Sequence, residues 1–474
     1  DLVRSRGLGD VYKRQPLAQG AAIPPDPARA GEYLNAVFRV RRYAPNYPGL
    51  AGRNLIPGGT VELKGYSNSL YFPHVASDGT WETEIALINT NAAQTVTGIL
   101  RPFTNEGQQL ETMQISLVPH ARREIIVGSE LARARQTAYI VFESDSANLV
   151  GYTKFYVQGK FRAAVPAAAT TSAGDLYLSH IASNDLWWTG VGLVNTTPSS
   201  RELKLQFDNG ETRTITMGAM SHRAFLVRSL FGNQPQPGLH SALLKNANGI
   251  IGLELFGSVN QLDGIPLTGE ASTTVYYPHI AADFPWWTGI LAYNPSDSIS
   301  DLTITPYDSE GRQLAPLRSS LAGKSQYVGV TTALGVPADA AWLLIEATKP
   351  IVGFELFGTQ DANVLAGFAG TGIRTKNGVF AKKERSGWTG IALVNVEQNP
   401  ATITLTAYDD AGNTIATQTI SLAAHAKVAK YASDFFVEDV SRATYFSFSS
   451  DRELAGFQLN GSADDTMLDA LPIM

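Results

Sequence analysis

Short runs in which apolar and polar residues alternate recur along most of the chain, and each leads into a polar turn that ends in glycine. The clearest four are GILRPFTNEG at 98–107, LKLQFDNG at 203–210, LTITPYDSEG at 302–311 and ITLTAYDDAG at 403–412. Alternation of period two places the apolar side chains on one face of a β-strand, and polar residues followed by glycine are typical of hairpin turns. Each run therefore predicts a half-buried strand that continues into a hairpin.

The same order of elements returns four times. Each copy opens with a strand-like element, and these are LYFPHVAS at 70–77, LYLSHIAS at 176–183, VYYPHIAA at 275–282 and VFAKKERS at 379–386. A tryptophan and an apolar run that ends in asparagine follow. These asparagines, Asn89, Asn195, Asn294 and Asn395, are 106, 99 and 101 residues apart. A residue shared by all copies belongs first to the scaffold, because an active site needs its residues only once.

Each copy closes with two further strands, and Gly151, Gly252, Gly353 and Gly456 mark one position in the last of them. About seven strands per hundred residues, without a sustained helical period, are typical of an antiparallel β-sandwich. A hundred residues also suffice for a core of their own. We therefore predict an all-β chain of four tandem immunoglobulin-like β-sandwich repeats, arranged like beads on a string. A propeller in which each copy forms two blades is the alternative.

The boundaries follow from these elements. The predicted sandwiches span residues 70–170, 171–270, 271–374 and 375–468, and residues 16–69 form a linker or the remnant of a preceding module, with a strand-like segment at 32–40. Residues 1–15 resemble the translated adapter read-through found at the start of metagenomic gene sequences, and ALPI at 470–473 resembles another such stretch. We treat both as sequencing artefacts outside the fold, so a signal peptide is not observable.

Composition narrows the class of protein. The 474 residues are 44% hydrophobic and 17% charged, as in globular proteins, and a formal net charge of −6 gives no general attraction to nucleic acid. No run of about eighteen apolar residues occurs, so we predict no transmembrane helix. Cysteine is absent, which excludes disulfide bonds, thiolate metal sites and cysteine nucleophiles.

Six of the seven histidines fall into two sets that repeat with the copies. One set is His74, His180, His279 and, in the fourth copy, Lys383; the other is His120, His222 and His425. No carboxylate or second histidine recurs beside them at metal-ligand spacing. We interpret them as strand-end or turn imidazoles hydrogen-bonded to the backbone, and we predict no metal and no cofactor.

Glu254 and Glu355 hold corresponding positions in the two central copies, and Lys154 and Gln458 take that place in the outer copies. A glycosidase of the paired-carboxylate type needs a second acid in the same cleft. The sequence nominates none, and it contains no G-x-S-x-G, glycine-rich phosphate loop or H-E-x-x-H motif. We therefore predict no catalytic residue and a protein that is not an enzyme.

The tryptophans are the most informative side chains. Trp81, Trp188, Trp287 and Trp388 follow the opening element in all four copies, so we assign them to the sandwich cores. Trp187 and Trp286 precede two of them, and neighbouring side chains in a strand point to opposite faces, so both indoles should point outward. An outward indole either stacks on a sugar or packs against the adjacent module, and packing is the favoured interpretation.

If a ligand is bound, we expect it at the two loops beside these outward indoles. The loops are SNDLW at 183–187 and ADFPW at 282–286. The candidate ligand-binding residues are Trp187, Trp286, Asp185 and Asp283.

Segments such as LVN at 393–395 and ITLTAYDDAG at 403–412 make the copies similar to the immunoglobulin-like or fibronectin-like β-sandwich modules of bacterial extracytoplasmic proteins, including the cell-adhesion-related type. The resemblance covers residues 70–468. It implies a secreted or surface-attached spacer, adhesin or carbohydrate-binding array, sometimes joined to an enzyme. The Cys–Trp–Cys core of antibody domains is absent.

We therefore expect a non-enzymatic bacterial protein, extracellular or at the cell surface, that acts as a structural spacer, adhesin or carbohydrate-binding array. The expected partners are surface glycans or other cell-surface proteins and not nucleic acid; the ligand and the oligomeric state stay open. The alternative is an accessory or propeller-like region of an extracellular glycan-active hydrolase, which requires one concave pocket with two acids or a metal. The placement of the repeats distinguishes these hypotheses, because an extended row favours the array of sandwiches and a closed ring favours the propeller-like hydrolase.

Overall fold

A computed structural model of the chain describes residues 38–39, 60–61, 68–281, 285–361, 363–370 and 373–474. The chain divides into two units, residues 1–67 and 68–474. In the first unit, β1 (Phe38–Arg39) pairs antiparallel with β2 (Thr60–Val61). The rest of the predicted strand-like segment at 32–40 lies outside the described residues, and so do residues 1–15.

The second unit consists almost wholly of antiparallel strands, as the alternating pattern predicts, and an all-β fold is confirmed. The pairing pattern divides it into four segments. Segment 1 contains β3 (Asn68–Phe72), β4 (Glu82–Asn89), β5 (Val96–Phe103), β6 (Met113–Leu117), β7 (Arg122–Ile126), α4 (Val127–Glu130), η2 (Ala134–Gln136), β8 (Tyr139–Ser144), β9 (Leu149–Val157) and β10 (Phe161–Pro166). Segment 2 contains β11 (Leu176–Leu178), β12 (Trp188–Asn195), β13 (Arg201–Phe207), β14 (Thr212–Met217), β15 (His222–Leu226), η3 (Val227–Phe231), β16 (Ala242–Lys245), β17 (Ile250–Gly257) and β18 (Leu262–Pro266).

The last two segments repeat this order of strands. Segment 3 contains β19 (Ser272–Tyr277), β20 (Trp286–Tyr293), β21 (Ser300–Tyr307), β22 (Leu317–Leu321), β23 (Gln326–Val330), β24 (Trp342–Thr359) and β25 (Leu365–Gly370). Segment 4 contains β26 (Thr375–Phe380), β27 (Gly387–Asn395), β28 (Ala401–Tyr408), β29 (Thr414–Leu422), β30 (Lys427–Tyr431), η4 (Ala432–Phe435), β31 (Tyr445–Ser462) and β32 (Leu468–Pro472).

Two groups of four paired strands form each segment. In segment 1 their orders are β3-β8-β5-β6 and β10-β9-β4-β7, and segment 2 has the equivalent sheets β11-β16-β13-β14 and β18-β17-β12-β15. In segments 3 and 4 one strand of 18 residues, β24 or β31, runs through both groups. The first part of β24 pairs with β19 and β21 and its last part with β20 and β25, so the pairing is unchanged although the sheet counts as seven-stranded.

Each segment encloses a hydrophobic cluster of its own. In segment 1, Phe72 from β3, Ile85 and Leu87 from β4 and Phe142 from β8 belong to one cluster and are fully buried. Equivalent clusters lie within segments 2, 3 and 4. Each core lies where the alternating pattern places it, because every second side chain of these strands points to the same side.

The four repeated asparagines are buried and have one structural task. The amide of Asn195 donates to the carbonyls of Ser199 and Gly218, and its oxygen accepts from the backbone N–H of Thr197. Asn89, Asn294 and Asn395 make the equivalent bonds, and all four side chains are 0% exposed. The asparagine therefore closes the turn after the central strand of each segment, since it satisfies backbone groups that lack a partner in the ladder.

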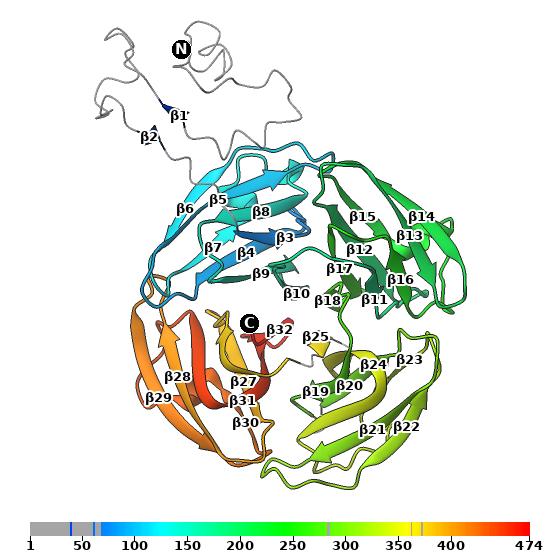
Figure 1. Ribbon diagram of the computed structural model, residues 1–474. Coiled ribbons are helices and arrows are strands. Elements are labelled where there is room, and N and C mark those ends of the chain that lie inside the picture. The colour runs from blue at the N-terminus through cyan, green and yellow to red at the C-terminus, as the bar shows by residue number, and fades with distance from the viewer. Residues whose placement is uncertain (1–37, 40–59, 62–67, 282–284, 362, 371–372) are drawn as a thin grey trace, which may run out of the picture. The chain divides into compact units, whose positions relative to one another are not determined.

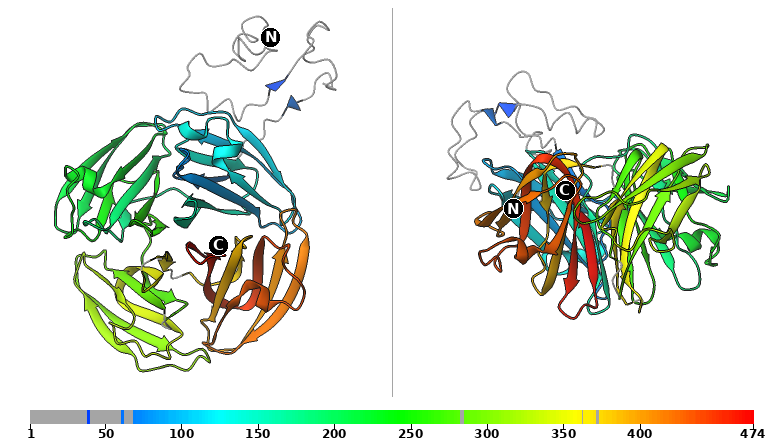
Figure 2. Two further views of the ribbon diagram at one scale, coloured as in Figure 1. Left: turned by 180° about the vertical axis from the view of Figure 1, so that it is seen from behind. Right: turned by 90° about the horizontal axis from the view of Figure 1, so that it is seen from below.

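The segments of the second unit follow one another around a ring, and the last lies beside the first (Figures 1 and 2). The strands β10, β18, β25 and β32 meet at its centre, where β10 and β25 each contact both β18 and β32. Aromatic side chains also join neighbouring segments: Tyr139 donates to the carbonyl of Met220, Trp342 to that of His425, and Tyr445 to that of His120. The expectation of beads on a string is therefore wrong for this unit.

The closed arrangement explains why the central strands are buried on both faces. In β4, Ile85 and Leu87 point into segment 1, whereas Ala86 and Ile88 belong to a cluster shared with Tyr408 and Tyr445 of segment 4. Exclusion of ALPI at 470–473 is also wrong, because Ala470 and Leu471 are buried in β32, which pairs with β31. None of the helices among the described residues is long and apolar enough to cross a membrane.

Candidate functional site

Pairs of tryptophans lie at three of the four junctions between segments. Trp81 and Trp188 share a cluster at the junction of segments 1 and 2, Trp187 and Trp287 at that of segments 2 and 3, and Trp286 and Trp388 at that of segments 3 and 4. All six indoles are half-buried. The assignment of Trp81, Trp188, Trp287 and Trp388 to the sandwich cores is wrong. In β12, Val191 and Leu193 point to the core, and Trp188 lies on the opposite face.

A slip of one residue in aligning the copies caused this error. Trp188 pairs with Gly257, Trp287 with Gly358 and Trp388 with Gly461, and the residue in that register in segment 1 is Glu82, opposite Tyr156. Trp81 is therefore equivalent to Trp187 and Trp286, and in segment 4 this place is Gly387. The fourth junction, between segments 4 and 1, thus has Glu82 and Gly387 where the others have two indoles.

The structure places two of the four predicted ligand-binding residues at junctions. Trp187 lies in a cluster that contains Phe354 of segment 3, and Trp286 lies in one that contains Phe457 of segment 4, so both indoles lie at the boundary with the following segment. Asp185 is exposed, and Asp283 lies outside the described residues. Ligand binding by these residues stays a prediction.

The histidine sets also need correction. Tyr277 and Phe380 occupy the same place in the pairing of β19 and β26, so the equivalent of His279 is Lys382 and not Lys383. His120 and His425 have left-handed backbone conformations, and the equivalents in segments 2 and 3 are Met220 and Lys324. His222 lies two residues further, at the start of β15, where Arg122 begins β7 and Lys427 begins β30.

These two positions face each other across the junctions. Nδ1 of His74 lies 3.1 Å from Nε2 of His222, and Lys427 contacts Nδ1 of His279 in the same way. The rings of His74 and His222 are 5.2 Å apart with 19° between their planes, so they meet almost end to end. Burial lowers the pKa of His74 to about 4, so this pair is neutral at pH 7.

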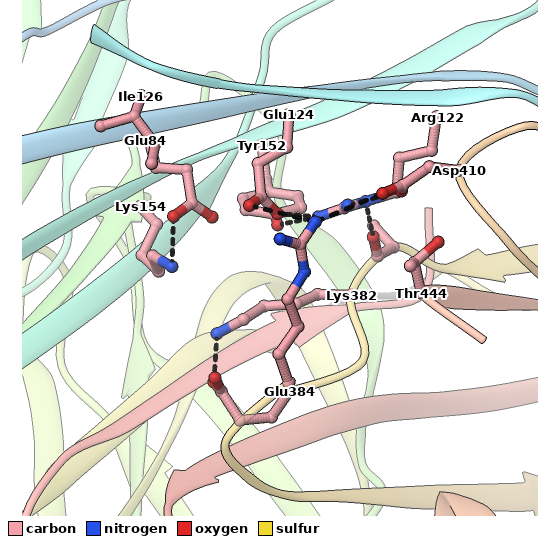
Figure 3. A network of polar contacts seen from close by, with 12 residues as sticks. Glu84, Arg122, Glu124, Ile126, Tyr152, Lys154, Lys382, Glu384, Asp410 and Thr444 are labelled. Atoms are coloured by element: carbon pink, nitrogen blue, oxygen red, sulfur yellow. Dashed lines mark hydrogen bonds and ion pairs between the residues drawn. The ribbon is translucent and has the colours of Figure 1, made fainter. Parts of the chain in front are cut away.

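At the fourth junction, ionic contacts replace the indoles (Figure 3). The guanidinium of Arg122 is 2% exposed and binds Asp410 of segment 4 at 3.0 Å, the hydroxyl of Tyr152 at 2.7 Å and the carbonyl of Ala381 at 3.2 Å. It also pairs with Glu124 of its own strand. Arg122 thus connects segments 1 and 4, which the chain does not join directly.

A second ionic group extends this junction to the centre of the ring. Asp469 in β32 is 0% exposed and pairs with Arg162 of β10 at 2.6 Å and with Lys382 at 2.8 Å. Burial acts to raise the pKa of Asp469, but the two cations outweigh it and hold the pKa at about 2. Glu384 receives both cations as well, at 3.0 and 2.9 Å. Because these carboxylates are neutralised by cations, their arrangement is that of a structural network.

The junction of segments 1 and 2 contains a groove with two compartments. The apolar compartment has a volume of about 330 Å³ and is lined by His74, Ala76, Trp81, Phe155, Trp188, Gly190, Val191, Gly192, Ala224, Phe225, Leu226, Leu253 and Leu255. The polar compartment, of about 640 Å³, is lined by His74, Val75, Ala76, Ser77, Asp78, Thr104, Asn105, Glu106, Gln108, Ala134, Arg135, Gln136, Thr137, Ala138, His222 and Ala224. Both share His74, Ala76 and Ala224, so the compartments adjoin.

Glycine creates the space in the apolar compartment. Gly192 lies on the junction face of β12, and its equivalent in β20 is Leu291, a fully buried member of the next junction cluster. A Cβ at Gly192 would lie 3.3 Å from Cβ of His74, so the strand closely approaches the preceding segment. The absence of a side chain at this position leaves free the space next to His74 in the apolar compartment.

Among the described residues, both indole N–H groups are unpaired at this junction, whereas one indole at each of the next two junctions is paired. Trp287 donates to the carbonyl of Thr359 and Trp388 to the carboxylate of Asp465. Among the described residues, the N–H groups of Trp81 and Trp188 have no hydrogen-bond partner, although both line the groove. Two unpaired indole donors thus belong to residues that line the groove.

Carboxylates line only the polar compartment. Oδ1 of Asp78 accepts the backbone N–H groups of Thr80 and Trp81, and these bonds lower the pKa of Asp78. The carboxylate of Glu106 has neither a hydrogen bond nor an ion pair among the described residues, and it faces the same space. Within the described part of the chain, no group of three His, Asp or Glu side chains is arranged to hold a metal ion.

The central glutamates lie elsewhere. Glu254 and Glu355 are fully buried, and Glu254 accepts the backbone N–H of His180 while Gln458 accepts that of Lys382. The equivalent residue in segment 1 is Thr153 and not Lys154, because Thr153 lies two residues after Gly151 as Glu254 does after Gly252. These side chains hold the strand β19 or its equivalents in place and do not line the groove.

Comparison with known proteins identifies one related sequence family. Residues 263–429, which run from β18 to β30 and include all of segment 3, match DUF5719, a family of unknown function. A search of curated proteins found no match.

Proposed function

We propose that this chain is a non-enzymatic carbohydrate-binding protein, secreted or attached to the bacterial cell surface, that binds a glycan in the groove between segments 1 and 2. The observation that carries the proposal is the pair Trp81 and Trp188, whose indoles line the groove and whose N–H groups are unpaired among the described residues. Indoles pack against the apolar parts of glycans, including the substituents of the sugar rings, and donate to their oxygens. The adjoining compartment supplies the carboxylates and amides that sugar hydroxyls require.

We further propose that each segment is an immunoglobulin-like sandwich. The hydrophobic cluster enclosed by each segment and its two groups of four strands support this classification. In this proposal the four sandwiches stabilise one another at junctions, and a linear spacer is not the favoured role.

Binding is favoured over catalysis because of where the acids lie. The carboxylates of Asp469 and Glu384 are paired with Arg162 and Lys382, and neither lines the groove. Asp78 accepts two backbone N–H groups, which hold the turn before Trp81. A general acid needs a raised pKa, whereas the pKa of Asp78 is lowered.

The test is glycan binding by the chain and by Gly192→Leu, measured on a glycan array and by isothermal titration calorimetry. The leucine places in the groove the side chain that segment 3 carries at Leu291, so we expect at least a tenfold loss of affinity. The melting temperature should fall as well, because the new Cβ would lie 3.3 Å from Cβ of His74, and binding is therefore compared at a temperature at which both proteins are folded. Gly174→Leu is the control, because a Cβ at Gly174 meets open space. Equal binding by wild type and Gly192→Leu, or no glycan bound at all, would refute the proposal.

A second function, glycan hydrolysis, is favoured by two observations. The unit is a closed ring, and Asp78 and Glu106 line one compartment. This alternative predicts release of reducing sugar from a bound glycan and its loss in Glu106→Gln with binding retained. If the bound glycan stays intact over prolonged incubation, hydrolysis is excluded and only the binding function is retained.

A further inference from the structure

We propose that the apolar compartment of the groove binds the acyl group of an acylated sugar, in the simplest case the acetamido group of an N-acetylhexosamine, while the sugar ring lies in the polar compartment. This inference rests on the proposed glycan-binding function and names the class of glycan. It follows from the hydrogen-bonding groups that each compartment offers.

The apolar compartment has donors but few acceptors. Its walls are hydrocarbon and aromatic side chains such as Phe155, Leu253 and Leu255, and the lining residues with polar side-chain atoms are Trp81, Trp188 and His74. A hexose ring would bring several hydroxyl donors into this space. A buried hydroxyl without an acceptor costs free energy, so the walls disfavour a bare sugar ring at this place.

An acyl group fits these walls because, unlike a sugar ring, it brings no hydroxyl donors that require an acceptor. Its methyl or methylene part requires only apolar contact, and its carbonyl oxygen requires one or two donors. Trp81 and Trp188 line the compartment, and in this proposal their N–H groups, which are unpaired among the described residues, are the donors to this oxygen. At the next junction the equivalent indole of Trp287 already donates to Thr359, and Leu291 fills the space.

His74 lies where the acyl linkage would cross from one compartment to the other. Nδ1 of His222 lies 2.8 Å from Oδ1 of Asn105, an acceptor, so this nitrogen carries the proton. Nε2 of His222 then accepts from Nδ1–H of His74, and Nε2 of His74 keeps its lone pair. An acetamido N–H passing this ring has an acceptor there, so both polar atoms of the amide are satisfied.

The polar compartment suits the sugar ring. Glu106 has a carboxylate without a partner among the described residues, and Asn105, Gln108 and Arg135 add amide and guanidinium groups. Hydroxyl groups are both donors and acceptors, and this mixture serves both needs. The two compartments therefore match the two parts of one acylated sugar.

The experiment compares tri-N-acetylchitotriose with cellotriose by isothermal titration calorimetry. Both are β-1,4 trisaccharides of neutral hexoses, and they differ by an acetamido or a hydroxyl group at C2. We expect at least tenfold tighter binding of the acetylated trisaccharide. O-acetylated xylotriose against xylotriose tests the ester form of the same group, and a gain in this pair alone would assign the compartment to O-acyl sugars.

Trp188→Phe removes the N–H and keeps an aromatic wall, so it should reduce the preference for the acetylated member and leave the binding of the non-acetylated member within about twofold. Trp287→Phe at the equivalent place of the next junction is the matched control and should leave the preference unchanged. Equal affinities within both pairs would overturn this inference while leaving glycan binding intact. Failure of all four trisaccharides and of every array glycan to bind would overturn the proposed function itself.

Discussion

Replacement of Arg122 should lower the free energy of unfolding more than replacement of any residue in a surface ion pair, because Arg122 holds segments 1 and 4 together. Replacement by alanine removes the contacts to Asp410, Tyr152 and Ala381 and leaves Glu124 without its main cation. Burial acts to raise the pKa of Glu124, but Arg122 outweighs it and holds the pKa at about 2 instead of 4.5. This difference corresponds to about 3 kcal/mol at neutral pH.

The expected loss for Arg122→Ala is therefore about 3–5 kcal/mol, as for other broken buried pairs. Arg312→Ala is the matched control, because its guanidinium is 77% exposed and binds Asp308 on the surface. Such pairs contribute about 0–1 kcal/mol. The stabilisation from a lowered carboxyl pKa is fully present above pH 4.5 and is lost as the pH falls towards 2, so the difference between wild type and Arg122→Ala should shrink over that range.

Two measurements check this prediction. Hydrogen exchange of β10 and β32 amides reports the free energy of opening this junction, and small-angle scattering reports an increase in radius of gyration if the ring opens. Both should respond in Arg122→Ala and not in Arg312→Ala. Equal exchange rates in the two variants would show that the ionic network does not hold the ring closed, and the argument from burial would fail.

Four further outcomes are expected. Asp263 is fully buried, and burial raises its pKa to about 8 although the backbone N–H groups of Gly264 and Gly367 act to lower it; stability should fall by about 5 kcal/mol as the pH rises from 4 to 8, and Asp263→Asn should flatten the dependence of melting temperature on pH. Because burial lowers the pKa of His74 to about 4, its contribution is present above pH 6.5 and is lost towards pH 4, and His74→Gln should weaken this acid sensitivity in denaturation scans. Asn195→Ala should cost about 2–3 kcal/mol in urea unfolding, because it leaves buried backbone groups unpaired, whereas exposed Asn209→Ala should cost little. Trp187→Ala should lower stability by about 2–3 kcal/mol, because the indole is half-buried against segment 3, and an unchanged melting temperature would contradict the junction packing.

Local pattern predicted the strands because hairpins and period-two alternation depend on near neighbours in sequence. The runs that end at Gly107, Gly311 and Gly412 are strand-turn units, and all three glycines have positive φ. The repeated asparagines are scaffold residues, as their recurrence indicates. These features require no knowledge of how the copies meet.

Closure of the ring was not predicted from the sequence, because the apolar residues of the central strands were assigned to the core of a single sandwich. Continuous apolar runs such as IALIN at 85–89 contain too few polar residues for a strand with one exposed face. Ala86 and Ile88 on the second face of β4 pack against segment 4. A strand buried on both faces needs a neighbour on each side, which an isolated sandwich does not provide.

The groove could not be predicted from tryptophan positions alone. Aligning Trp81 with Trp188 instead of Trp187 exchanged the two faces of the strand, because a shift of one residue reverses side-chain direction. It also concealed Glu82 at the place of an indole. The sequence does show that Gly192 differs from the other copies, which have Ala86, Leu291 and Ala392 at this position. That the glycine leaves space for a groove follows only from the structure, because the groove lies between this strand and segment 1.

Glu82 and Gly387 make the junction of segments 4 and 1 different from the other three, and this difference helps to determine which segments become neighbours. A chain of four similar segments has several ways to bring neighbours together while it folds, and three junctions accept an indole from each side. If segment 1 docked against segment 2 or 3 in place of segment 4, its acidic edge would meet aromatic surface and Arg122 would lose Asp410. In such mispaired arrangements Arg122 would keep only Glu124 and Tyr152 of its own segment, so the unlike junction disfavours misordered assembly.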